Sequence, residues 1–506
     1  MDHLFAPPLD PEGVGPAAVA PYALRKVEAS LLARGIEDVV VVDPQNLSRV
    51  VGPDTKVLGL TAHDPLGLSP VSTKLTMLFG GGPCWNAVYF EELGQQIRAL
   101  RRRHRFAVIA GGPGIWQMSY ERPPWVDLVY MGEAERDFPR LVQEALRGAF
   151  LPPVVQGRPP TLEEIPPIVH PSRMGEVQIT RGCPRGCEFC SITPERYRTV
   201  PWSQIEQEIR VNQRAGEFNV ELITDDVLLY GAQKLRTQHK AVVGLFENLK
   251  AAGARQIGFA HISAPAVRES PETVRQMGDI AGWPQSRGMT PVVGLETGSV
   301  RIFKKYMPAK AYPFKPLEWP QTILEATEIL NDAGIDPCYT MTIGFPDETD
   351  EDVQQTIALV QDLIDRGLRA FLFPLPVIPI STSRIRGNPM PQLERLPLKY
   401  WDLLGVCWHY DMRMARALLP SLVGRMKSSL ARQTIALFVE RLTEHVDRVF
   451  EEFRQTHGRS ADRYRSINLA GAWGTLRSLG WLLWGIVNGR PGGSPAGPRY
   501  LTAPTS

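Results

Sequence analysis

The sequence predicts an α/β protein with an N-terminal doubly wound, Rossmann-like domain, a central partial (β/α)6 barrel and a mostly helical C-terminal domain. Three observations predict it. Short apolar strands alternate with helical patterns over residues 20–147 and again over 176–389, a proline-rich stretch separates the two series, and strand signals fade after residue 393. A chain of 506 residues has room for two to four domains. We place these domains at residues 1–155, 176–392 and 393–506, with a linker at 156–175.

The first domain is predicted from apolar runs at residues 38–43, 57–61, 107–112 and 127–130, with helical patterns at 21–35 and 91–104. Continuous apolar strands between helices are typical of a parallel sheet covered on both faces. Such a sheet binds its ligand at the carboxyl ends of its strands. The prolines of residues 151–175 indicate a linker, because proline fits neither a central strand nor a helix interior.

The barrel is predicted from six apolar segments, each followed by a helical pattern, at residues 177–180, 220–223, 257–260, 292–295, 339–343 and 370–373. This repetition favours β/α units closing into a barrel or part of one.

The C-terminal domain shows helical periods, as over residues 428–455, and is rich in tryptophan: Trp401, Trp408, Trp473, Trp481 and Trp484. We expect these side chains to pack a helical cap, and the lining of an apolar substrate cavity is the alternative. The apolar stretch 479–487 is about half the length of a membrane span. A helix that covers a domain is favoured there over a foot at a membrane surface. The Gly/Pro-rich tail after residue 488 is expected to be disordered.

Composition excludes several classes of protein. The formal charge is +2 and the basic run 101–105 ends a helical pattern, so no nucleic-acid partner is expected. No run of about 18 apolar residues and no signal peptide is visible, which predicts a cytoplasmic chain without a transmembrane segment. Of six cysteines, three fall within eight residues, which indicates a reducing compartment and a metal site rather than a disulfide framework.

Those three residues, Cys183, Cys187 and Cys190, have C-x3-C-x2-C spacing in one loop after the first barrel segment. Three thiolates so placed can hold three irons of a 4Fe-4S cubane and leave the fourth open. Zinc is the alternative, but structural zinc sites want four ligands, and Cys84, Cys338 and Cys407 are scattered. The same scatter argues against an auxiliary cluster.

With this motif, the barrel region resembles the radical S-adenosylmethionine (SAM) superfamily. The resemblance implies that the open iron binds SAM, that an external donor such as flavodoxin or ferredoxin reduces the cluster, and that a 5′-deoxyadenosyl radical forms. Further matches stand at later strand ends. They are Phe189 near the adenine, Thr224, Asp225 and Asp226 for the methionine amino group, Ser263 and Glu296 for the ribose and carboxylate, and Gly344 and Pro346 in a G-F-P turn beside the adenine. Which of the two aspartates binds the ligand is left open.

The first domain resembles the cobalamin-binding domain of one radical SAM subfamily, the class B methyltransferases. Its matching segments follow successive strands: Thr61, His63, Asp64 and Pro65 after one, Gly111 and Gly112 after the next, and Gly132 and Glu133 after the third. Glycines there are expected to let a bulky ligand approach the backbone. The D-x-H-x-x-G motif of the lower cobalt ligand is absent, so we expect base-off cobalamin without histidine coordination. His63 is more readily a local loop residue than a ligand.

The resemblance implies methyl transfer from methylcobalamin to an unactivated carbon of a small-molecule or lipid-like substrate. We expect the loop 61–70 and the barrel strand ends to face one cavity. A cobalamin-dependent cyclisation, ring contraction or oxidation is the second enzymatic hypothesis. A non-catalytic corrinoid or Fe–S sensor is the third, and the predicted SAM contacts disfavour it.

Overall fold

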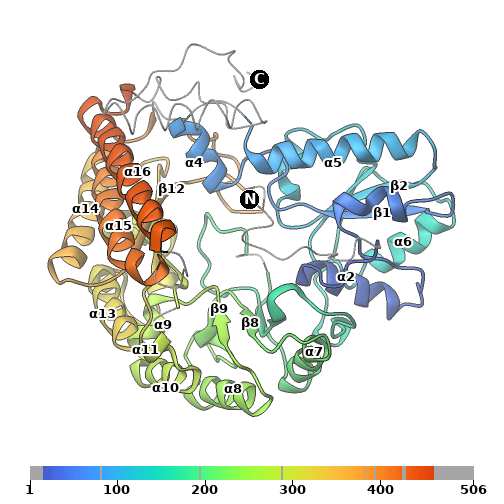
Figure 1. Ribbon diagram of the computed structural model, residues 1–506, viewed down its shortest axis with the longest axis horizontal. Coiled ribbons are helices and arrows are strands. Elements are labelled where there is room, and N and C mark those ends of the chain that lie inside the picture. Colours follow the sequence, from blue (N-terminus) through green and yellow to red (C-terminus); the bar gives the residue numbers. More distant parts are fainter. Residues whose placement is uncertain are drawn as a thin grey trace. The chain divides into compact units, whose positions relative to one another are not determined.

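The computed structural model describes residues 15–79, 83–192, 195–286, 289–380, 382–392, 395–423 and 429–460 (Figure 1). The chain forms two compact units. The first comprises residues 1–68, 86–184 and 191–261, and the second 69–85, 185–190 and 262–506. The units therefore cut the sequence differently from the three expected domains, whose boundaries stay a prediction.

The first unit contains a four-stranded parallel sheet in the order β1-β2-β3-β4. Its strands are β1 (Val57–Thr61), β2 (Ala107–Gly111), β3 (Leu128–Met131) and β4 (Val154–Gln156). The surrounding helices are α2 (Tyr22–Leu32), η1 (Pro44–Asn46), α3 (Leu47–Val50), α5 (Trp85–Arg101), η2 (Ile115–Ser119) and α6 (Phe138–Leu146).

Both faces of this sheet are covered, as the continuous apolar strands predict. Successive residues of β2 point to opposite faces: Val108 joins the core that includes Ile97 of α5, and Ile109 joins the core that includes Leu141 of α6. A parallel sheet that is buried on both faces needs apolar side chains at successive positions. Its strands therefore do not alternate between apolar and polar residues.

One expected strand is absent and an unexpected one replaces it. The valine run within residues 38–43 forms only an isolated bridge, from Val42 to Pro16, and Val40 is 51% exposed. β4 instead arises inside the proline-rich stretch that we expected to be a linker. Pro152 and Pro153 precede its first residue, where a missing N–H costs no ladder bond, and the Pro153 carbonyl accepts from Val129 N–H.

The rest of that stretch is a packed connection. It contains η3 (Leu162–Glu164) and η4 (Arg173–Gly175), and the side chains of Ile165 and Ile168 are buried. Ser172 donates through its N–H to Asn212 Oδ1 of α7 (Trp202–Arg214) over 2.8 Å. The connection thus ties the first sheet to the next part of the same unit.

All six expected barrel strands are present, as two three-stranded parallel sheets. The first unit holds β5 (Glu176–Gln178), β8 (Val220–Ile223) and β9 (Ile257–Phe259), in the order β5-β8-β9. It also contains the antiparallel pair β6 (Thr180–Arg181) and β7 (Arg198–Thr199), η5 (Val227–Leu229) and α8 (His239–Ala251).

The second unit holds the order β10-β11-β12, from β10 (Val292–Glu296), β11 (Cys338–Ile343) and β12 (Phe371–Pro376). Its helices are α4 (Pro70–Phe79), α9 (Ala264–Glu269), α10 (Pro271–Ala281), α11 (Trp283–Ser286), α12 (Val300–Tyr306), η6 (Pro308–Ala311), η7 (Pro316–Glu318), α13 (Trp319–Asp332), α14 (Asp350–Asp365), α15 (Lys399–Val423) and α16 (Ser429–Thr456).

The outer edge of β12 is protected against further strand pairing. Phe371 and Val377 donate their N–H groups towards β11, so residues 372, 374 and 376 face outward. Positions 374 and 376 are prolines without an N–H, and Leu372 N–H donates to the Asp411 carboxylate of α15 over 2.8 Å. Proline and a covering helix are common ways to close a sheet edge.

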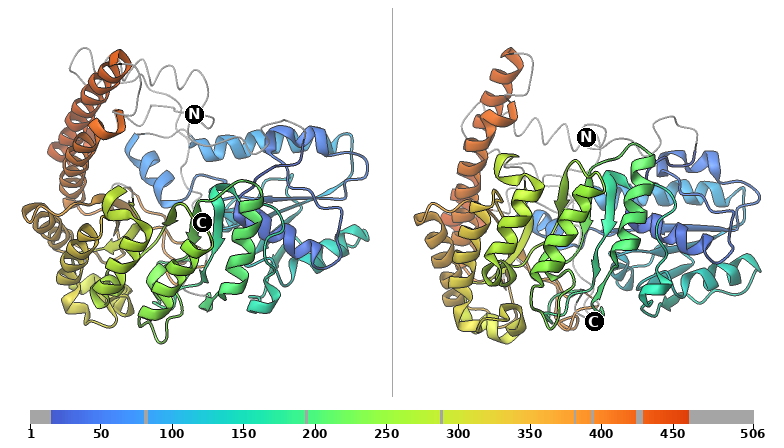
Figure 2. Two further views of the ribbon diagram at one scale, coloured as in Figure 1. Left: turned by 60° about the horizontal axis from the view of Figure 1, so that its bottom comes forward. Right: turned by 90° about the horizontal axis from the view of Figure 1, so that it is seen from below.

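The C-terminal helices α15 and α16 lie side by side (Figures 1 and 2). Trp408 stacks on Phe450 at 4.6 Å between ring centroids, and Trp401 packs against Phe453 at 5.6 Å. These two tryptophans pack helices, as expected. Trp473, Trp481, Trp484, the apolar stretch 479–487 and the tail after 488 lie outside the described residues. In the part of the chain that the structure describes, no helix is both long and apolar enough to span a membrane.

Candidate functional site

The cysteine loop follows β6. Gly182 starts it with φ +80°, and an added Cβ there would lie 2.8 Å from the Arg196 carbonyl oxygen, so the loop can turn this tightly only at glycine. Cys183 belongs to the first unit, and Cys187 and Cys190 belong to the second. All six cysteines of the chain are thiols. Among the described residues, no three His, Cys, Asp or Glu side chains surround a single metal-ion position.

Arg185, between the first two cysteines, anchors the second unit's part of this loop. Its guanidinium is buried and donates to the carbonyl of Lys310 over 3.0 Å and to Ser263 Oγ over 2.7 Å. The predicted SAM contact Ser263 is therefore held by the cysteine loop itself. The sequence motif gave no role to Arg185.

Phe189 and the G-F-P turn meet through aromatic contacts. Phe189 packs edge-on against Phe345 at 5.7 Å, and Phe345 stacks on Tyr306 of α12 at 4.5 Å. Gly344 has φ +90° and donates its N–H to Glu348 over 2.5 Å, whereas Pro346 is exposed. Burial raises the pKa of Glu348 to about 8. The two segments predicted to lie beside adenine thus do come together.

The three residues after β8 have different surroundings. Thr224 Oγ1 is 2.6 Å from Thr180 Oγ1, and Asp226 is buried and accepts from Leu228 N–H at the start of η5. Asp225 is only partly buried and accepts from Gly182 N–H. Burial raises the pKa of Asp225, against the opposing effect of His261. Of the two aspartates, Asp225 is the one whose carboxylate is not committed to a helix start.

Glu296 ends β10 in a left-handed conformation, with φ +64°, at a β-bulge. A side chain rarely adopts this conformation, and the cost is about 1–3 kcal/mol. Thr342 of β11 donates to Glu296 Oε2 over 2.7 Å, and the ammonium of Lys310 donates to Oε1. No sequence motif pointed to Lys310.

In the first sheet, two glycines allow loops of the protein itself to touch. An added Cβ at Gly112 would lie 2.3 Å from Thr61 Oγ1, and one at Gly114 would lie 2.0 Å from the His63 carbonyl oxygen. Close packing of the 61–64 loop therefore already explains these glycines, whereas an added Cβ at Gly111 would make only an ordinary contact, 3.6 Å from the Tyr130 carbonyl oxygen.

The polar residues of the 61–64 loop differ in their exposure to solvent. Asp64 is buried and accepts from Gln117 Nε2 over 2.7 Å, and Pro65 beside it is also buried. Thr61 and His63 are exposed. Asp64 therefore holds the loop in place, and the exposed side chains are the ones available to a ligand.

Glu133 binds two arginines. Its oxygens accept from Arg181 and Arg198, each over 2.6 Å, and Glu135 accepts from Arg181 over 2.8 Å. Gly132, with φ +98°, lets the chain turn just before. The G-E-A-E segment therefore binds the strand pair β6–β7 on either side of the cysteine loop, and a contact of the Glu133 carboxylate with a corrinoid stays a prediction.

This buried pairing predicts a large effect on stability. Arg181→Met should lower the free energy of unfolding by about 3–5 kcal/mol, because it leaves the buried carboxylate of Glu135 without its arginine and the carboxylate of Glu133 with Arg198 alone. Chemical denaturation of the full-length protein measures it. Arg158→Met is the matched control: its guanidinium also pairs with a carboxylate, Asp137, but is 64% exposed, so the loss should stay below about 1 kcal/mol. Equal losses in the two variants would contradict the assigned role of Arg181.

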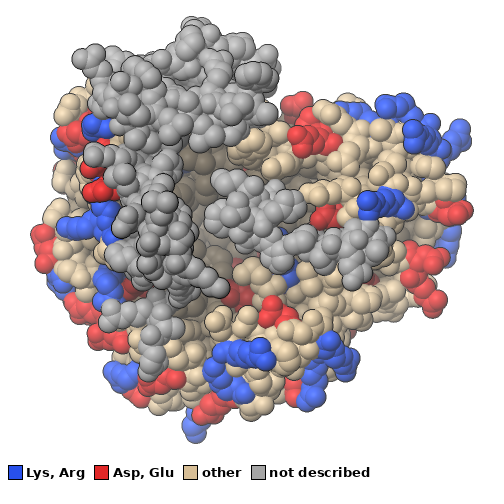
Figure 3. Space-filling model, viewed as in Figure 1, with Lys and Arg blue, Asp and Glu red and all other residues tan. Residues whose placement is uncertain are grey.

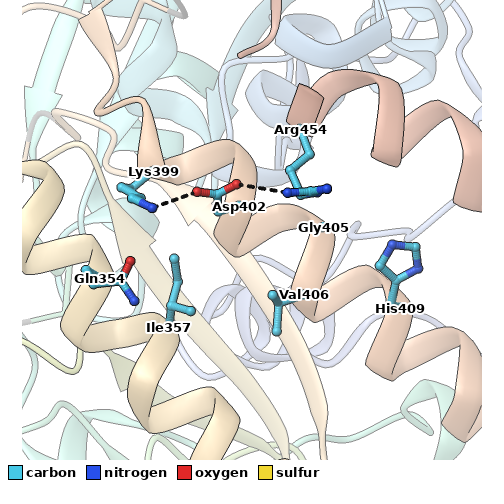
Figure 4. A pocket seen from close by; sticks show the side chains of 8 residues that line it. All are labelled: Gln354, Ile357, Lys399, Asp402, Gly405, Val406, His409 and Arg454. Carbon is cyan, nitrogen blue, oxygen red and sulfur yellow. Dashed lines mark hydrogen bonds and ion pairs between the residues drawn. The ribbon is translucent and has the colours of Figure 1, made fainter. Parts of the chain in front are cut away.

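A separate pocket of about 360 Å³ lies among α14, α15 and α16 (Figure 4). Its charged groups pair with one another: Asp402 contacts Lys399 at 3.1 Å and Arg454 at 3.9 Å. None of the predicted site residues lines it.

Comparisons with known proteins identify the domain that contains the cysteine loop. Residues 177–360 match the family model of the radical SAM superfamily. The tRNA-2-methylthio-N(6)-dimethylallyladenosine synthase of Geobacter sulfurreducens is 25% identical over 60% of this chain and 67% of its own length. An uncharacterized methyltransferase of Pyrococcus horikoshii is 24% identical over 56% of this chain and 63% of its own. The chain thus spans between about half and two thirds of the curated relatives it matches.

Among solved structures, the chain is similar to TsrM of Kitasatospora setae, a radical SAM methyltransferase. One structure of TsrM, with cobalamin and a 4Fe-4S cluster bound, matches with a TM-score of 0.51 at 14% identity, over 72% of this chain and 71% of that one. A second, with tryptophan substrate and a SAM analogue, has a TM-score of 0.52. Residues 177–360 thus form a radical SAM domain, and the chain shares the fold of TsrM over 72% of its length.

Proposed function

We propose that this protein is a cobalamin-dependent radical SAM enzyme that methylates an unactivated carbon of a small-molecule or lipid-like substrate. The observation that carries the proposal is the combination of three thiols in one loop at the head of a radical SAM domain with a parallel sheet in the TsrM-like fold. Bound SAM and cobalamin would supply the radical and the methyl group. The protein would supply binding, orientation and exclusion of water.

The donor set fits such a cluster. Cys183, Cys187 and Cys190 are thiols within eight residues of one loop. Iron–sulfur clusters are held by cysteine thiolates, and three from one loop leave one iron for an external ligand. Asp225 would accept from the amino group of SAM, and the Phe189–Phe345 contact would form an apolar wall beside the adenine.

The first sheet would hold the corrinoid at the ends of β1 to β3. Thr61 and His63 have exposed side chains there, and the last residue of β2, Gly111, has no side chain that would keep a ligand from the backbone. We propose that the cobalt of this cobalamin has no histidine ligand, because the D-x-H-x-x-G motif is absent from the sequence. An external electron donor of the flavodoxin or ferredoxin type would deliver the electron to the cluster.

Methylthio transfer to RNA is a second candidate, since several sequence relatives are named tRNA-2-methylthio-N(6)-dimethylallyladenosine synthase. Two features favour the first candidate. Of the three remaining cysteines, Cys84 precedes α5, Cys338 lies on β11 and Cys407 is buried on α15, so the described residues offer no second loop with several thiols as a sulfur source. On the face in Figure 3, lysine and arginine side chains are interspersed with aspartate and glutamate rather than gathered in a basic surface.

Cofactor binding and turnover test the proposal together. Full-length protein, reconstituted with iron and sulfide, should bind hydroxocobalamin in a base-off state that is visible by absorbance and electron paramagnetic resonance. After reduction with dithionite, SAM should give 5′-deoxyadenosine, and a small-molecule extract should yield a methylated product with S-adenosylhomocysteine. Failure to bind micromolar corrinoid would contradict the mechanism.

The same assay separates the other hypotheses. A methylthio group on added tRNA would support the second candidate. Deoxyadenosine without any methylated product would favour a cyclisation or oxidation, and absence of deoxyadenosine from a protein with an intact cluster would favour a sensor.

A further inference from the structure

Lys310 of η6 lies beside the part of the cysteine loop that belongs to its own unit. Its side chain is only 11% exposed. Its ammonium pairs with the carboxylate of Glu296 and lies within electrostatic range of the thiols of Cys187 and Cys190, two of the predicted cluster ligands.

The backbone around Lys310 is fixed to the same loop. The Lys310 carbonyl accepts from Arg185 over 3.0 Å, and Glu188 N–H donates to the Tyr306 carbonyl just before η6 over 3.0 Å. Arg185 lies two residues before Cys187, and Glu188 lies between Cys187 and Cys190. These two contacts fix the backbone of η6 against the loop, and the pairing with Glu296 fixes the ammonium of Lys310.

The carboxylate of Glu296 is also fixed by hydrogen bonds. Thr342 donates to one of its oxygens, and Lys310 donates to the other. Its strained backbone places the carboxylate in the second unit's sheet at the end of β10. The charged groups that these contacts bring to the loop of Cys187 and Cys190 are therefore the cations of Lys310 and Arg185 and the anion of Glu296.

Resting on the cluster that the proposed function assigns, we propose that Lys310 is a positioning residue that, together with Glu296, sets the reduction potential of that cluster. Reduction by one electron from a low-potential donor adds one negative charge to the cluster, with no bond formed and no proton taken. A nearby cation stabilises the reduced form and raises the potential, and a nearby carboxylate lowers it. Lys310 offsets Glu296 and leaves the cluster reducible.

The test is a redox titration of full-length, reconstituted protein, followed by electron paramagnetic resonance of the reduced cluster. Lys310→Met should lower the midpoint potential by about 59 mV or more, which is a tenfold loss in the one-electron reduction equilibrium. Lys310→Arg should restore most of it, because the charge returns. Glu296→Gln should shift the potential the other way, and the double variant should lie between the two single ones.

Lys304→Met is the matched control, since Lys304 is exposed on the neighbouring helix α12 and should leave the potential unchanged. A potential of Lys310→Met equal to that of Lys304→Met, with iron retained, would overturn the inference. If Lys310→Met fails to hold iron, Glu296→Gln decides: a raised potential supports the inference, and an unchanged or lowered one overturns it. A wild-type protein that assembles no cluster would instead contradict the proposed function itself.

Discussion

Replacing Cys183, Cys187 and Cys190 together by alanine is expected to remove the brown iron–sulfur chromophore and all SAM cleavage. Only these three of the six cysteines share one loop. An Fe–S cluster is held by its thiolate ligands, and no other thiol of the chain follows that spacing. Iron content and the absorbance of the reconstituted protein measure the loss.

The control is the triple variant with alanine at Cys84, Cys338 and Cys407, which should keep its iron. Cys407 is buried in α15, so some loss of stability is expected, about 1 kcal/mol for a small core truncation. The unfolding curve separates that loss from a loss of the cluster. If this second variant lost the iron while the first kept it, the assignment of the cluster loop would be wrong.

Asp225→Asn is expected to weaken SAM binding by about tenfold to a hundredfold. The change keeps the shape of the side chain but removes the charge proposed to bind the amino group of SAM, and a hydrogen bond to a charged group contributes about 1.5–3 kcal/mol. Equilibrium dialysis of SAM against the reconstituted, unreduced protein measures the affinity directly, without dependence on turnover.

Asp226→Asn is its neighbour and its control. Because Asp226 is buried and accepts from Leu228 N–H at the start of η5, its amide variant should lower stability and leave the affinity for SAM nearly unchanged. The N–H of Gly182, which immediately precedes Cys183, donates to Asp225. The absorbance of the cluster is therefore measured in both variants. A larger loss of SAM affinity in Asp226→Asn than in Asp225→Asn would reverse the assignment.

The sequence by itself determined the positions of the barrel strands and the cysteine loop. Each strand is a local run of apolar residues, as at Val292–Glu296. It can therefore be predicted from its own residues and from the helical pattern that follows it. The cysteine spacing is likewise local, because three thiols within eight residues can reach one cluster whatever the rest of the fold. The aromatic slot at Phe189 and the turn at Gly344 followed from the same motif order.

Only the tertiary structure decided which residues of those motifs face which partner. The valine run at 38–43 has strong strand propensity, yet the sheet found its fourth partner at Val154–Gln156, because a strand exists only where another strand pairs with it. Asp225 and Asp226 are identical in kind, and the helix start at η5 alone commits one of them. Glu133 meets Arg181 across 48 residues, and Lys310 meets Glu296 across 14. Such pairings depend on where the chain returns in space, and the order of residues along the chain carries no local signal for that.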